Sequence, residues 1–308
     1  MSRTVLITGA SGLIGKPLTE LLITKGYTVH QLSRSLDRGN KGCKVFKWAV
    51  SKMEIDKKCL ENVDVIINLA GEGIADKAWT NKRKEEIIKS RTGAIQLLHN
   101  VLKSNPNHQV KTFISSSAVG HYGDRGDEVL TEDSEPGTDF LANTCLAWER
   151  AADKIENLHI KLIKFRTGVV LTTDGGALPK MAQPIKLGAG AVLGTGNQWV
   201  PWIHLEDAIN MYVYALENEH LQGIFNMAAP FPVTNNELTQ ALAKQLNRPL
   251  WLPKVPALAL RIMLGEMCWV VLNSNRTSAD KIIGTGFNFK FPKLEAALSD
   301  IYARKASH

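Results

Sequence analysis

The chain of 308 residues carries 37 Lys and Arg against 30 Asp and Glu, giving a formal net charge of +7, and 44% of it is hydrophobic. This usage is typical of a globular protein with a sizeable core and excludes a disordered or fibrous chain. The basic residues are scattered, and a nucleic-acid groove would need a basic stripe with interleaved aromatics, so we expect no nucleic-acid partner.

The cysteines and the apolar stretches indicate the cellular compartment in which we expect the protein. Cys43, Cys59, Cys145 and Cys268 lack the spacing of a metal site, and a disulfide framework is not expected in a chain this long. The start of the chain has no cationic region followed by a long apolar one, so we expect no signal peptide. The longest apolar stretch, residues 255–272, is interrupted by charged residues. It therefore predicts a buried helix or a helix that forms a lid over the substrate, and not a membrane-spanning helix. We therefore expect a cytoplasmic protein with no metal and no membrane partner.

Apolar runs and amphipathic segments alternate along the first 170 residues. The runs at 4–8, 27–33, 63–69, 111–117 and 160–166 predict strands, and segments 17–25, 80–103 and 139–157 predict helices. This order indicates an α/β fold with a Rossmann-type, doubly wound parallel sheet in residues 1–170. Residues 171–308 are expected to form a smaller, mostly helical substrate domain. Within it, a segment near 199–228 is expected to pack back on the Rossmann domain.

A glycine-rich turn follows the first expected strand and opens a helix. It reads Gly9-Ala10-Ser11-Gly12-Leu13-Ile14-Gly15. Such a turn lets backbone approach a pyrophosphate, and the helix N-terminus offers free N–H groups and partial positive charge. A plain βα turn is the alternative, but strand, turn and helix stand in the required order. The sequence therefore predicts dinucleotide contacts from Gly9, Ser11, Gly12, Leu13, Ile14 and Gly15.

The end of the second expected strand discriminates between the two dinucleotides. NAD binders usually place a carboxylate there for the ribose 2′-hydroxyl, but this strand ends in Ser33-Arg34 and the first acid is Asp37. A guanidinium and a hydroxyl suit a 2′-phosphate. A solvated loop arginine is the alternative. We predict NADP(H) as the cofactor, bound in part by Ser33 and Arg34.

Further motifs resemble those of the extended, epimerase-like short-chain dehydrogenase/reductases. Besides the glycine turn they are Asn68-Leu69-Ala70-Gly71 and Ser115-Ser116-Ser117-Ala118. An atypical branch, the epimerase family proteins, is more similar still. The motifs that carry this similarity are Ser90-Arg91, His121-Tyr122-Gly123, Trp148-Glu149, Arg166-Thr167-Gly168-Val169, Gly175-Gly176 and Pro201-Trp202-Ile203-His204.

The resemblance implies cofactor contacts beyond the glycine turn. It places Leu69, Ala70 and Gly71 beside the adenosine ribose, and Glu86 and Arg91 within reach of the cofactor from the long helix. It also implies contacts from Ser115, and from Arg166, Gly168 and Val169 near the nicotinamide. Many relatives associate through two long helices, so a homodimer through residues 80–103 and 139–157 is implied as well.

The catalytic pair of that superfamily is absent. Its reductases and epimerases use a serine with a tyrosine and a lysine four residues apart on a helix, where the lysine lowers the tyrosine pKa. Ser117 matches the serine, but Leu141 and Cys145 stand at the other two positions. No tyrosine in the chain is followed four residues later by lysine.

Two hypotheses follow. In the first, the protein is an NADP(H)-dependent oxidoreductase or epimerase for an unidentified small carbonyl or sugar-nucleotide substrate, with Ser117 and Tyr122 catalytic and His121 or His204 assisting. In the second, it is a catalytically impaired NADP(H)-binding sensor or interaction module. Cys145 fits a small buried filler better than a nucleophile. The run Lys82-Arg83-Lys84 is expected on a solvated helix face.

Overall fold

A computed structural model describes residues 3–306 of the chain. Its centre is an eight-stranded sheet in the order β12-β8-β6-β5-β1-β2-β3-β4, parallel except for the β3–β4 pair. The strands are β1 Thr4–Thr8, β2 Thr28–Ser33, β3 Lys44–Ala49, β4 Glu54–Ile55, β5 Val65–Asn68, β6 Thr112–Ala118, β8 Lys161–Thr167 and β12 Gly223–Met227. The doubly wound α/β fold expected from the sequence is confirmed.

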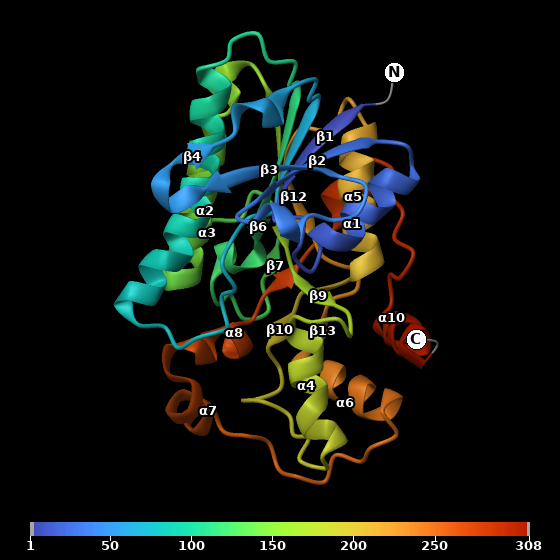
Figure 1. The fold of residues 1–308 in the computed structure, drawn as a ribbon. Coiled ribbons are helices and arrows are strands. Elements are labelled where there is room, and N and C mark those ends of the chain that lie inside the picture. Colours follow the sequence, from blue (N-terminus) through green and yellow to red (C-terminus); the bar gives the residue numbers. More distant parts are fainter. Residues whose placement is uncertain (1–2, 307–308) are drawn as a thin grey trace.

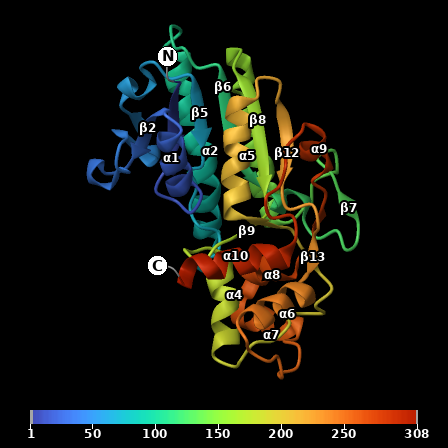
Figure 2. The same ribbon diagram turned by 90° about the vertical axis from the view of Figure 1, so that its right-hand side faces the viewer.

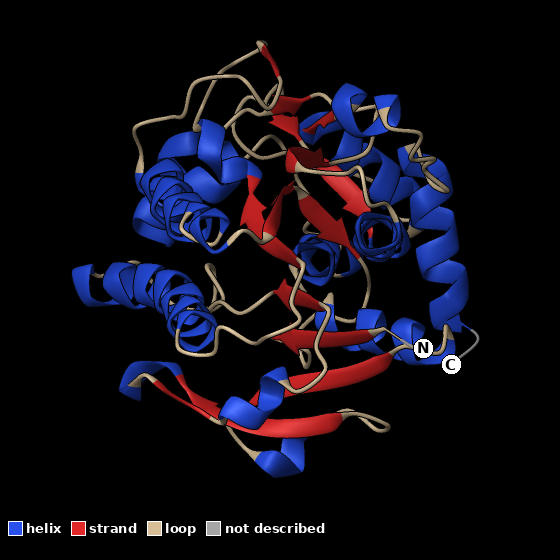
Figure 3. Cartoon of the chain, turned by 90° about the horizontal axis from the view of Figure 1, so that it is seen from above, coloured by secondary structure: helices blue, strands red, loops and turns tan. Residues whose placement is uncertain are grey.

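Two helical layers cover the sheet (Figures 1 and 3). Helices α2 (Asn81–Lys103) and α3 (Phe140–Asp153) pack on one face, and α1 (Gly15–Thr24) and α5 (Leu205–Glu217) on the other. Strands such as β1 and β5 are buried along their whole length. This explains their uninterrupted apolar sequences, because both faces of the sheet are covered.

Residues from the second half of the chain complete this sheet. Strand β12 pairs with β8 in parallel, and α5 packs against α1. The crossover from β8 to β12 passes through two short strands, β9 (Val169–Leu171) and β11 (Trp202–His204), which pair with each other.

The remaining elements form a second lobe with its own core, which includes Leu178, Trp202, Leu238 and Leu298. The lobe lies beyond the carboxyl ends of the central strands, and α10 runs crosswise between the sheet and α4 and α6 (Figure 2). Its helices are α4 Ala177–Lys186, α6 Asn235–Gln245, α7 Ala257–Leu264, α8 Trp269–Leu272 and α10 Leu294–Ala306, with α9 Asp280–Gly284 beside β12. Its short strands are β10 Trp199–Val200 and β13 Val233–Thr234, while β14 Arg276–Thr277 pairs with β7 Val129–Leu130.

One part of the lobe differs from expectation. Residues 255–272 were expected to be a buried or lid helix, but the structure divides them into α7, a 3₁₀ turn (Gly265–Cys268) and α8. Side chains of α7 are strongly exposed, with Ile262 77% and Met263 76% accessible. Within residues 3–306, no helix combines the length and apolarity needed to cross a bilayer.

Candidate functional site

The glycine turn lies where β1 ends and α1 begins. Gly9 has φ +66°, and a Cβ there would lie 2.7 Å from the Leu69 carbonyl oxygen. A Cβ on Gly15 would lie 2.1 Å from the Gly9 carbonyl oxygen, so side chains at either position would break the turn. Ser11 and Gly12 are exposed. The turn thus presents backbone to solvent directly ahead of a helix N-terminus, as a pyrophosphate site requires.

The loop after β5 is tied to this turn by one hydroxyl. Thr8 Oγ1 donates to Asn68 Oδ1 at 2.8 Å and accepts from the backbone N–H groups of Leu69 and Ala70, each at 3.1 Å. Leu69 and Ala70 are half-buried, and Gly71 is exposed. These residues, expected beside the adenosine ribose, therefore lie next to the glycine turn at the same edge of the sheet.

Ser90 and Arg91 on α2 fix the next residue of that loop. Ser90 Oγ accepts from the Glu72 N–H at 3.1 Å, and Arg91 Nη2 donates to the Glu72 carbonyl at 3.0 Å. The Arg91 guanidinium also lies over the Trp148 ring, 5.0 Å from its centroid. Arg91 thus borders the candidate cofactor site while holding its wall in place.

Ser33 ends β2 and Arg34 follows it, on the other side of β1 from Leu69 and Ala70. The Arg34 side chain is 83% exposed, and its Nη1 lies 3.9 Å from a carboxylate oxygen of Glu72. Since β2 and β5 both neighbour β1, this pair bridges the loops after these two strands across the end of β1. Arg34 is therefore free to exchange Glu72 for a phosphate. No role for Glu72 was predicted from the sequence.

The second lobe closes the site opposite the sheet. A Cβ on Gly176, the residue before α4, would lie 3.0 Å from the Leu13 side chain, and one on Gly175 would lie 3.3 Å from it. The Gly175-Gly176 motif therefore lets the N-terminus of α4 approach the glycine turn. The N-termini of α1 and α4 thus both border the candidate cofactor site.

Ser117 belongs to a buried hydrogen-bond network. Its Oγ donates to Glu149 Oε1 at 2.7 Å. Arg166 binds both oxygens of Glu149, at 2.9 and 3.0 Å, and its Nη1 reaches the Tyr122 hydroxyl at 3.1 Å. The Tyr122 hydroxyl in turn donates to Asn226 Oδ1 at 2.6 Å. The network joins β6, α3, β8 and β12, which makes it a structural link across the sheet.

This placement argues against the catalytic role predicted for Tyr122. The side chain is fully buried, and its hydroxyl already has a donor and an acceptor. Burial raises the pKa of Tyr122, and the lowering influence of Arg166 does not offset it. A phenol that keeps its proton and has no open side is a poor general base.

Ser115 and Arg166, expected at the cofactor, also point into the interior. Ser115 is 1% exposed, and its hydroxyl donates to the Ser116 carbonyl. Arg166 is 3% exposed and is committed to Glu149. The resemblance located these segments at the strand ends, but helices cover both faces of the sheet, so side chains on either face of β6 and β8 are buried. Gly168 and Val169 stay half-buried at the sheet edge.

The structure also assigns a role to Glu149, which the sequence marked only as part of a motif. Burial alone would raise the pKa of Glu149, but the hydrogen bonds and charge of Arg166 outweigh it and lower the pKa. His121 lies 3.7 Å from the same carboxylate. Burial lowers the pKa of His121 to about 4, so it is neutral at pH 7. The pair is therefore Glu149⁻ and Arg166⁺ beside an uncharged imidazole.

The positions of the missing tyrosine and lysine are filled by packing residues. Gly120 lies against both, since a Cβ on it would be 3.3 Å from Leu141 Cβ and 3.8 Å from Cys145 Sγ. Burial raises the pKa of the Cys145 thiol to about 12, so it is protonated and not nucleophilic. This supports the reading of Cys145 as a filler.

The run at 82–84 does not lie wholly on a solvated face, contrary to expectation. Arg83 is 7% exposed and donates to the Gly73 carbonyl at 2.8 Å. It also pairs with Glu86 at 3.2 Å and Glu72 at 3.5 Å. Glu86, expected to reach the cofactor, is therefore held by Arg83, which also contacts Glu72 and Gly73.

One cluster has ligand types that suit a metal, but its bonding does not. His204, Glu206 and Asp300 have ligand atoms within 4.8 Å of one another. His204 Nδ1 accepts the Glu206 N–H at 3.0 Å, so the proton of the neutral ring is on Nε2, which faces Asp300 at 3.2 Å. Arg304 pairs with both carboxylates. His204 therefore caps α5 and anchors α10.

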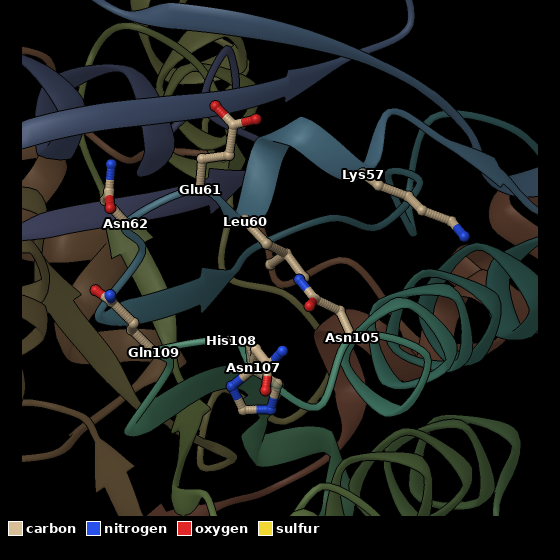
Figure 4. A pocket seen from close by; sticks show the side chains of 8 residues that line it. All are labelled: Lys57, Leu60, Glu61, Asn62, Asn105, Asn107, His108 and Gln109. Carbon is tan, nitrogen blue, oxygen red and sulfur yellow. The ribbon is translucent and has the colours of Figure 1, made fainter.

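A pocket at the opposite edge of the sheet is unsuited to a dinucleotide. It has a volume of about 320 Å³ and is lined by Lys57, Leu60, Glu61, Asn62, Asn105, Asn107, His108 and Gln109 (Figure 4). These residues belong to loops before β5 and β6, at the amino ends of the strands. Neither the glycine turn nor a helix N-terminus borders it.

Comparisons with known proteins identify the family of the chain. The model of the NAD dependent epimerase/dehydratase family matches residues 5–228. The chain belongs to the NAD dependent epimerase/dehydratase family. A second model, a domain of unknown function, matches residues 255–301.

Relatives match over nearly the whole chain. The epimerase family protein YfhF of Bacillus subtilis is 38% identical, over 97% of this chain and 98% of its own. The chloroplastic SDR39U1 homolog of Arabidopsis thaliana is 36% identical, over 97% and 86%. A crystal structure of human SDR39U1 with NADPH superposes with a TM-score of 0.85, 30% identity and coverage of 97% and 99%. The predicted resemblance is confirmed.

Proposed function

We propose that this chain binds NADP(H) between the carboxyl ends of the central strands and the second lobe. The observation that carries the proposal is the glycine turn. Backbone carbonyl oxygens lie so close to Gly9 and Gly15 that neither position has room for a side chain. The human relative, similar over almost the entire chain, was solved with NADPH. Ser33 and the exposed Arg34 would hold the 2′-phosphate, and Arg91 would face the cofactor from α2.

On this basis we propose an oxidoreductase or epimerase that acts on a small carbonyl or sugar-nucleotide substrate. The nicotinamide, when bound, would supply hydride chemistry. The half-buried Gly168 and Val169 and the segment around Gly120 would lie beside the nicotinamide. Ser117 and Tyr122 would act there as positioning residues, because their hydroxyls are committed to Glu149 and Asn226.

The filled positions of Leu141 and Cys145 favour a second candidate, an NADP(H)-binding sensor without turnover. A panel of carbonyl compounds and sugar nucleotides, followed by NADPH absorbance and by sugar analysis, separates the two. Turnover with any substrate that survives Tyr122→Phe supports the enzyme with Tyr122 in a positioning role. Tight NADPH binding with no turnover across the panel supports the sensor.

Cofactor choice is tested by Arg34→Ala. We expect NADPH affinity to fall about tenfold or more while NADH affinity stays unchanged, because a charge-assisted bond to the 2′-phosphate contributes about 1.5–3 kcal/mol. Dissociation constants come from nicotinamide fluorescence titration. Arg150→Ala, which removes an exposed arginine on α3, is the matched control.

Glu72→Gln should change NADPH affinity in the opposite direction. It removes the negative charge beside Arg34, so NADPH should bind about two- to fivefold tighter, the size expected for an exposed ion pair. Equal losses for NADPH and NADH in Arg34→Ala would remove the assignment of the 2′-phosphate.

A further inference from the structure

The far end of the second lobe exposes an unusual set of large apolar side chains. They are Leu187 (76% exposed), Trp251 (70%), Leu258 (69%), Ile262 (77%) and Met263 (76%), here called the lobe-end patch. Among the other described residues, the most exposed large hydrophobic side chain is Leu36, at 57%. Single exposed apolar residues are ordinary, but a local concentration marks an interaction surface.

Two segments that adjoin the patch, residues 190–194 and 250–255, run side by side. Val255 donates to the Val192 carbonyl and accepts from the Gly194 N–H, each at 2.9 Å. A Cβ on Gly190 would lie 2.8 Å from the Leu250 side chain, next to Trp251. Figure 1 shows the loop from α6 to α7 passing along this end of the molecule, below α4. Leu187 follows α4, and the loop leads into α7.

Helix α7 presents one apolar face outward. Leu258 and Ile262 are four residues apart and share that face, while Leu260 is buried at 5% exposure. Nothing in the fold of residues 3–306 covers Leu258 and Ile262, as their exposure shows. The face is therefore available to a partner.

The segments that carry the patch are strongly basic. The sequence has no Asp or Glu from 175 to 205 and only Glu266 from 238 to 279, where it pairs with Lys84 of α2. The same segments contain seven Lys and Arg, so together they have a net charge of +6. Four of them, Lys186, Arg248, Lys254 and Arg261, are exposed and flank the patch in sequence.

We propose that the lobe-end patch docks the protein on the surface of an anionic lipid bilayer. Apolar side chains on a short helix, with a tryptophan beside them, suit the boundary between headgroups and acyl chains. Each flanking cation should increase the partition coefficient onto an anionic leaflet about fivefold. The expectation of no membrane partner rested on the lack of a spanning segment, and docking of this kind needs none.

A second copy of the chain fits less well, because a symmetric contact through this patch would bring the flanking cations of both copies together. Nucleic acid would use the cations but leave the apolar side chains without a partner.

Co-sedimentation of the full chain with vesicles tests the proposal. We expect retention on phosphatidylcholine vesicles that contain phosphatidylglycerol, weak retention on phosphatidylcholine alone, and weakening at high salt. Ile262→Ser should lower partition about tenfold, since it withdraws one large apolar side chain from the acyl region. Arg248→Glu should lower it severalfold.

Ile283→Ser on α9, where Ile283 is 41% exposed, is the matched control and should bind as wild type. Thermal melts establish that each variant is folded. The proposal is overturned by no retention on the anionic vesicles, or by Ile262→Ser binding as wild type. Self-association abolished by Ile262→Ser without vesicle binding would also overturn it, in favour of a second copy.

Discussion

At the scale of single residues, the molecule replaces a catalytic pair by an internal ion pair. Leu141 and Cys145 stand where the superfamily has its tyrosine and lysine, and the nearby polar groups are directed inward to Glu149 and Arg166. The sequence could show that the pair was missing. It could not show that Tyr122 is buried, because that depends on β12 bringing Asn226 to its hydroxyl.

Glu149→Gln should be strongly destabilising, because it leaves Arg166 charged and unpaired in the interior. We expect the free energy of unfolding to fall by about 3–5 kcal/mol, measured by urea denaturation at pH 7. Glu85→Gln, which breaks only the exposed pair with Lys89, should cost less than about 0.5 kcal/mol. A loss for Glu149→Gln no larger than for this control would show that the pair is unimportant for stability.

At the scale of elements, strong local signals predicted the structure well. The strand expected at 4–8 has the same bounds in the structure, and the helix expected at 80–103 spans Asn81–Lys103. Strands β3 and β4 went unpredicted, because Lys44 and Lys47 interrupt the apolar pattern of a strand near the sheet edge. Exposure of α7 was also missed, since apolar sequence alone cannot show whether a partner covers it.

The contact between α5 and α10 makes stability depend on pH through His204. Burial lowers the pKa of His204 to about 4, below the unfolded value of about 6.5. The unfolded chain therefore binds the extra proton between these values, and the stability from this residue is lost as pH falls from about 6.5 to 4, by roughly 3 kcal/mol in full.

The check is the free energy of unfolding measured across this pH range. His204→Asn keeps a side chain that can cap α5 but removes the titration, so the slope should decrease. It should not vanish, since His121 titrates in the same window. His220→Asn, at an exposed site, should leave the slope as in wild type. An unchanged slope in His204→Asn would contradict the assignment.

At the scale of the whole molecule, the candidate cofactor site and the lobe-end patch lie apart. The candidate site has the two helix N-termini and the Arg34–Glu72 pair, whereas α7 and the loop before it, which carry most of the patch, lie at the far end of the second lobe (Figure 1). The doubly wound sheet and the glycine turn followed from sequence order alone. The composition of the candidate site did not, because it depends on Gly175 and Gly176 meeting Leu13 across the fold.

A crystal structure of the chain with NADPH tests the central claim most directly. We predict the pyrophosphate at the Gly9–Gly15 turn ahead of α1, the 2′-phosphate between Ser33 and Arg34, and the nicotinamide toward Gly168 and Val169. NADPH bound elsewhere, for example in the asparagine-lined pocket at the opposite edge, or no binding at saturating NADPH, would contradict the account.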